Sequence, residues 1–231
     1  MTRRFTLLAC LVCVNFLGLA LSEAMAHPLD DAISTRKERD ETGKERYFIS
    51  VKTGLIDRYL DRIGAHAKTY PPKFANDDER KLVTSDLKRL IGVLEIVKEN
   101  GPDLKLRYAN AQAMAYNLDI DGSGEGAVGA FEQLLEANPD DPQANYALGM
   151  FLAGTGDTTD SIPFLEQALA LGKSHAQYTL GLIELEHGSK TEGLRMLEDY
   201  CAKYPENAHA QEMLVAAREN RLTFYSTPPL D

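Results

Sequence analysis

Residues 142–156 read PQANYALGMFLAGTG, and residues 174–188 read SHAQYTLGLIELEHG. Both stretches place a Tyr two positions before a Leu-Gly pair, and both end in Gly. Extending the alignment in both directions gives three consecutive units of about thirty-four residues, namely 108–141, 142–173 and 174–207. A repeat of this length indicates one supersecondary unit stacked several times, because a single unit cannot bury its apolar face alone.

Small residues recur where two helices of each unit would cross. They are Ala115, Gly149 and Gly181 in the first half of each unit and Ala127, Ser161 and Gly193 in the second half, with Pro139 and Pro205 closing the first and third units. This pattern resembles the tetratricopeptide repeat family, whose units are antiparallel helix pairs. The resemblance implies an all-α, right-handed solenoid with helical caps.

The flanks of the repeats divide into four segments. Residues 27–46 are polar and charge-dense, which predicts a flexible leader. Residues 47–102 carry two apolar helical stripes around Tyr70-Pro71-Pro72, so they form either a helical hairpin or a degenerate repeat. Residues 208–221 suit a capping helix, and residues 222–231 are a tail.

The amino terminus is typical of an export signal. Arg3 and Arg4 precede an apolar run from Phe5 to Leu21, and Ala24-Met25-Ala26 fits the cleavage site. We therefore expect residues 1–26 to be removed and the protein to be exported, to a bacterial periplasm or to the medium. An uncleaved anchor and lipidation at Cys10 remain as alternatives.

Charge is distributed unevenly along the chain. Without the signal, 23 basic and 34 acidic residues remain, and residues 103–207 alone hold 6 basic and 17 acidic residues. An acidic surface disfavours nucleic acid and anionic membranes and suits a basic protein partner, or solubility alone. Only Cys201 would remain in the mature chain, at a position expected to be buried, so no internal disulfide is possible.

The resemblance also implies which residues would face a partner. In this family, fixed positions of each unit's first helix line a concave inner face. Those positions hold Gln112, Tyr116, Gln143, Tyr146, Met150, His175, Tyr178, Leu182 and Leu185, and a fourth copy of the pattern adds His209 and Glu212. Aromatic and apolar side chains facing a groove suit an extended or helical peptide, although Tyr146 and Tyr178 could instead pack between helices.

The sequence gives little support for a metal site, a calcium site or a dinucleotide site. His175 and His209 hold equivalent positions, but two His without a third ligand make a weak metal site, leaving a pH-sensing pair or two solvated residues. The stretch from Asp119 to Gly124 imitates a calcium loop but has Ala130 where the bidentate acid belongs. The glycines of 124–129 lack the strand and acid of a dinucleotide site.

We therefore expect a non-catalytic adaptor without cofactor or metal that binds a protein or peptide outside the cytoplasm, in cell-envelope assembly or function. The alternative is a structural spacer or self-associating scaffold subunit. Neither the partner nor the oligomeric state follows from the sequence.

Overall fold

The computed structural model describes residues 30–224. The predicted signal peptide, the first residues of the leader and residues 225–231 of the tail lie outside that range. Its elements are a short 3₁₀ turn η1 (Asp30–Ala32), strands β1 (Ile33–Arg39) and β2 (Glu45–Val51), helices α1 (Thr53–Ala67) and α2 (Asp77–Val97), a 3₁₀ turn η2 (Lys98–Asn100), and helices α3 (Pro102–Tyr116), α4 (Ser123–Ala137), α5 (Pro142–Thr155), α6 (Thr158–Ala170), α7 (His175–His187), α8 (Lys190–Lys203) and α9 (Ala208–Arg218). Within residues 30–224, none of these helices has both the length and the apolar character needed to span a bilayer.

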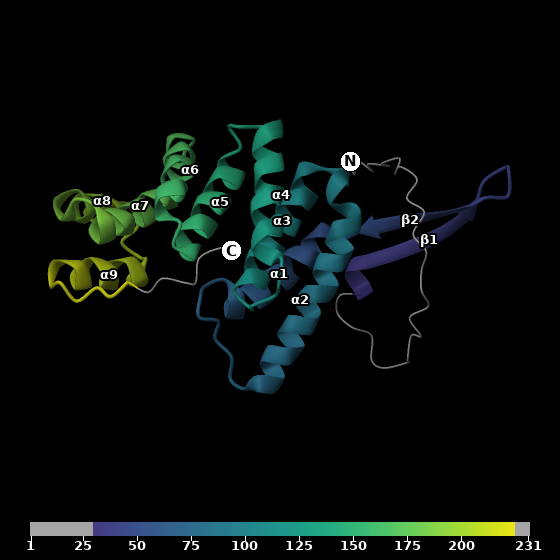
Figure 1. The fold of residues 1–231 in the computed structure, drawn as a ribbon, viewed down its shortest axis with the longest axis horizontal. Helices are drawn as coiled ribbons and strands as arrows, with labels where there is room; N and C mark the ends of the chain where they lie inside the picture. The colour runs from purple at the N-terminus through teal and green to yellow at the C-terminus, as the bar shows by residue number, and fades with distance from the viewer. Residues whose placement is uncertain (1–29, 225–231) are drawn as a thin grey trace.

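The helices are arranged as consecutive pairs. The pairs α3–α4, α5–α6 and α7–α8 each pack closely, and each also contacts its neighbour through α4–α5 or α6–α7. Figure 1 shows the pairs following one another along the long axis, with α9 against α8 at one end. The expectation of a mostly helical repeat fold is confirmed.

In the third unit, glycines allow the two helices to cross with their backbones in contact. A Cβ added to Gly193 of α8 would lie 2.8 Å from the carbonyl oxygen of Gly181 and 2.9 Å from the backbone nitrogen of Leu185, both in α7. Those two α7 atoms are hydrogen-bond partners in an α-helix, so the α8 backbone packs directly on the α7 backbone. In the second unit, a Cβ on Gly149 would instead meet the Leu165 side chain at 2.7 Å.

The helices before the repeats share a core with the first unit. Ile56, Ile63, Leu87 and Leu94 are fully or almost fully buried in the same cluster as Phe131 of α4. Helix α2 is capped at its amino end by Asn76, whose side chain accepts a hydrogen bond from the Glu79 backbone nitrogen at 2.9 Å.

Polar contacts fix α1 against its neighbours. The Arg107 guanidinium of α3 donates two hydrogen bonds to the Asp57 carboxylate of α1, at 2.6 and 2.8 Å. The Tyr59 hydroxyl of α1 donates to Asp86 of α2 at 3.0 Å, and burial together with that carboxylate raises the pKa of Tyr59 to about 12. These helices therefore dock on the repeats as part of one body.

A β-hairpin is the main departure from the expected architecture. The prediction of a flexible leader over 27–46 and of a purely α fold is wrong, because β1 and β2 pair antiparallel from Ile33↔Val51 to Arg39↔Glu45. The connecting turn is closed by Asp40, whose carboxylate accepts from the backbone nitrogens of Thr42 and Lys44. Gly43 takes a positive φ of 83° in this turn, a conformation that glycine adopts without steric cost.

Two helices near the carboxyl end have unusual features. Helix α6 begins at Thr158 and carries Pro163 in its second turn. The missing N–H of Pro163 leaves the Thr159 carbonyl without its usual helical donor. The predicted cap over 208–221 is shorter, since α9 ends at Arg218 and Asn220 adopts a left-handed φ of 54°.

Candidate protein-binding surface

In the third unit, five rings from α7, the end of α8 and α9 form one aromatic cluster. Tyr200 of α8 is 2% exposed, and its hydroxyl lies 2.6 Å from Nδ1 of His175 and accepts from Asn207 Nδ2 at 3.2 Å. The ring centroid of Tyr178 lies 5.4 Å from that of Tyr200 and 6.2 Å from that of His209. The rings of the cluster are His175, Tyr178, Tyr200, Tyr204 and His209.

Burial shapes the chemistry of this cluster. It raises the pKa of Tyr178 to about 12, with a further contribution from Tyr200. Leu182 and Leu185 are half-buried against the same hydrophobic cluster, which also includes Leu197 and Leu214. The third-unit positions predicted to face a partner are therefore largely anchored in the core, with His175 and His209 exposed at its edge.

The second unit supplies a more open surface. Tyr146 is half-buried against Leu165 and Leu180, and burial raises the pKa of its hydroxyl. Met150 is 38% exposed, although its sulfur accepts a hydrogen bond from Thr179 Oγ1 of α7 at 3.0 Å. Met150 therefore combines exposure with contact between successive units.

Two further polar positions belong to the edges of this surface. Gln143 accepts from Lys173 Nζ at 2.5 Å, which links α5 to the turn before α7. Glu212 of α9 is exposed.

In the first unit, the two predicted positions diverge. Gln112 donates to the Tyr108 hydroxyl at 2.7 Å, and its amide would lie 3.0 Å from a Cβ on Gly126, so it covers α4. Tyr116 points to the next unit, where its ring meets Phe151 of α5 edge-on with centroids 5.5 Å apart.

Two further kinds of site, a metal site and a reactive thiol, were searched for among residues 30–224. Across residues 30–224, no group of three or more His, Cys, Asp or Glu side chains could hold a metal ion. His175 and His209 each contact tyrosine rings. Cys201 is 4% exposed, and burial raises the pKa of its thiol, as expected for a packing residue rather than a reactive one.

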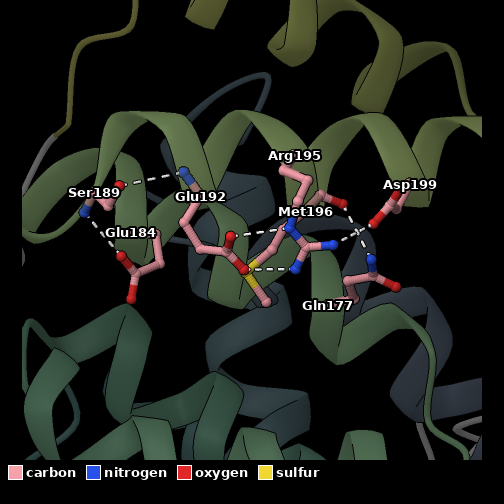
Figure 2. A network of polar contacts seen from close by, with 7 residues as sticks. All are labelled: Gln177, Glu184, Ser189, Glu192, Arg195, Met196 and Asp199. Carbon is pink, nitrogen blue, oxygen red and sulfur yellow. Dashed lines mark hydrogen bonds and ion pairs between the residues drawn. The ribbon is translucent and has the colours of Figure 1, made fainter.

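On α8 of the third unit, two acidic side chains are paired with an arginine. Figure 2 shows Arg195 of α8 between Glu192 and Asp199, with distances of 2.9 Å from Nε to Glu192 and 2.7 Å from Nη1 to Asp199. Arg195 lowers the pKa of the Glu192 carboxylate. In the same view, Gln177 of α7 donates to the Met196 carbonyl of α8 at 3.3 Å.

The comparison with protein families agrees with this geometry. A family model described as tetratricopeptide repeat matches residues 121–176, which span α4, α5, α6 and the first residues of α7. These residues carry the tetratricopeptide repeat. The resemblance drawn from the Leu-Gly pairs is thereby confirmed, and tetratricopeptide repeats support a role in protein–protein interaction. A search among curated proteins finds no match.

Sequence reasoning missed several aromatic residues that pack beneath or beside the predicted partner-facing positions. Tyr200 occupies a position that holds Leu134 and Ala168 in the other units, and Tyr204 follows the end of α8. A bulky aromatic at a position filled by an aliphatic residue in its neighbours was a visible signal. Phe151, one residue after Met150, could not be predicted from the sequence, because its role depends on its ring contact with Tyr116 of the preceding unit.

Proposed function

We propose that the chain is a non-catalytic adaptor whose tetratricopeptide repeats form a right-handed superhelix and bind a segment of a partner protein along the inner face. The proposal rests on the apolar and aromatic side chains that the first helices of successive units carry at Tyr116, Met150, Tyr178 and Leu182, of which Met150 is exposed and the other three are half-buried. Such side chains offer affinity through burial, while the acidic repeats favour a basic segment and speed its encounter.

The export signal predicted for residues 1–26 supports a place of action outside the cytoplasm. Within this proposal, the adaptor works in the cell envelope, as in assembly of an envelope complex. A photo-crosslinking amino acid at Met150, introduced in cells and followed by mass spectrometry, identifies the partner and its compartment together.

Met150 also provides the decisive variant. Met150 is 38% exposed, so Met150→Lys places a charge on the inner face without breaking the core. We expect about tenfold weaker binding of the identified partner segment in a titration, because a buried contact is replaced by a desolvated charge. Tyr146 and Tyr178 are poorer choices, since both are half-buried among core side chains.

Ile96 gives the matched control. It is 46% exposed on α2, outside the repeats, so Ile96→Lys makes the same chemical change elsewhere. Equal binding by the Met150 variant and the parent, with circular dichroism unchanged in both, would place the binding surface somewhere else.

A further inference from the structure

The β1–β2 hairpin projects away from the helices as a preformed arm. Figure 1 shows it extending from the end of the molecule opposite α8 and α9. Its base is fixed, because Ile33, Ile49 and Val51 pack against the main hydrophobic cluster. Every residue of β1 after Ile33 is exposed, and the Asp40 turn orders the tip.

Aromatic rings and cations alternate on this arm. The Arg36 guanidinium lies 5.6 Å from the centroid of the Phe48 ring, and the Lys37 ammonium lies 5.6 Å from that of Tyr47. Tyr47 is 62% exposed, the highest value among the large exposed apolar side chains of residues 30–224. Tyr and Arg are enriched at protein interfaces, and rigid arms lose little entropy on binding.

Three cations of the arm, Arg36, Lys37 and Arg39, pair with carboxylates at the surface. Arg36 pairs with Glu38 at 2.7 Å, while Lys37 and Arg39 share Glu45 at 2.7 and 3.3 Å. Such exposed ion pairs contribute little to stability, so they exchange readily for acids on another molecule.

The same chain carries a complementary surface. Residues 108–172 contain no Lys, Arg or His and ten acidic residues: Asp119, Asp121, Glu125, Glu132, Glu136, Asp140, Asp141, Asp157, Asp160 and Glu166. Among the described residues, only Asp119 of these ten forms an ion pair, with Arg80 at 2.9 Å. The third unit differs, because Arg195 pairs there with both Glu192 and Asp199.

Helices α4 and α6 hold some of the exposed acids of that stretch. Glu132 and Glu166 occupy equivalent positions on the second helices of successive units, and both are exposed, as is Glu136. We define the acidic face as Glu132, Glu136, Asp160 and Glu166.

We propose that the β1–β2 hairpin of one copy docks on the acidic face of a second copy. Complementary charge selects the occupant, and the direction of the arm requires a second molecule, because the hairpin leads away from the α4–α6 helices of its own chain. The two surfaces differ, so the contact is heterologous and builds a chain of copies or a closed ring.

Charge-swapped variants of the full chain test this contact by sedimentation velocity. Arg36→Glu with Arg39→Glu makes the arm acidic, and Glu132→Lys with Glu166→Lys makes the receiving face basic. The parent is expected to associate at about 50 mM salt and to dissociate at about 500 mM salt. Each variant alone is expected to associate about tenfold more weakly or worse.

Mixing the two variants gives the most informative measurement. The acidic arm of one then meets the basic face of the other, and the unaltered arm meets the unaltered face, so association is expected to return to within about threefold of the parent. A hairpin that merely failed to fold would not be rescued in this way. Arg58→Glu with Lys88→Glu, at exposed basic residues of α1 and α2, is the control with the same net charge and is expected to associate like the parent.

Three results would overturn the proposal: a monomeric parent at low salt, parent-like association of the arm variant, or a mixture that stays dissociated. Binding of the arm to phosphatidylglycerol vesicles in place of self-association would also overturn it, in favour of a lipid surface. Met150→Lys is expected to self-associate normally, which separates this contact from the proposed peptide-binding face.

Discussion

The first and third repeat units hold their helices together in different ways. In the third unit, Gly193 lets α8 touch the α7 backbone, and Tyr200 fills the space beyond it with a buried, hydrogen-bonded ring. In the first unit, Ala115 and Ala127 take the small positions, while α4 carries Gly129 with nothing within 4 Å of an added Cβ. Glycine is therefore a packing requirement in one helix pair and a cost in the other.

Gly193→Ala tests the third unit and has the largest expected effect. The new methyl group would collide with backbone atoms of α7, which cannot turn aside as a side chain can. Overpacking of about 3 kcal/mol, less about 1 kcal/mol gained in helix propensity, gives a net loss near 2 kcal/mol in the free energy of unfolding. Urea denaturation measures it, and a parent-like midpoint would mean that α7 and α8 do not approach so closely.

Gly129→Ala tests the first unit in the opposite direction. The site is helical and open, so the substitution is expected to add about 1 kcal/mol to the free energy of unfolding. The same denaturation experiment serves, and Gly126→Ala is an instructive companion. A Cβ there would press on the flexible Gln112 side chain at 3.0 Å, so its gain is expected to be smaller.

Tyr178→Phe probes the aromatic cluster through pH. The folded pKa of Tyr178 is raised to about 12, so the folded protein holds this proton more tightly than the unfolded chain, whose tyrosines titrate near 10. The stability that the raised pKa of Tyr178 gives the folded protein is fully present below pH 10, and it is lost as the pH rises toward 12. The variant is therefore expected to lose less stability between pH 9 and pH 11 than the parent.

The control for that experiment is Tyr47→Phe, on the exposed arm. An identical alkaline loss in the parent and in Tyr178→Phe would show that Tyr178 is not buried in the folded protein in solution.

The sequence was sufficient for the repeats but not for the arm. Period, Leu-Gly pairs and terminal prolines depend on local helix packing, so they predict the helix pairs and the crossing at Gly181 and Gly193 directly. The hairpin was missed because the charge density of residues 27–46 matches disorder, while Tyr47, Ile49 and Val51 were assigned to a helical region. Gly43 before an aromatic and β-branched run was the signal that favoured a hairpin.

The partner-facing positions were harder to predict, for a physical reason. Aligning each unit with the repeat pattern predicts the direction of each Cβ. Which atoms the side chain then contacts depends on the neighbouring unit. Met150 is exposed, whereas Gln112 folds back on α4 and Tyr178 is drawn toward Tyr200. Tyr200 itself departs from its equivalents in the other units, so its network with His175 and Asn207 emerges only from the packed structure.

The anchoring of the hairpin base has a practical consequence for protein production. Ala32 is 1% exposed, and its carbonyl accepts from the Lys52 backbone nitrogen at 2.8 Å. A truncation that begins at residue 47 would follow from treating residues 27–46 as a flexible leader. It removes β1 and exposes apolar surface near Ile56. We expect such a fragment to aggregate and to be poorly soluble. A fragment that begins before Asp30 keeps the hairpin and the folded body.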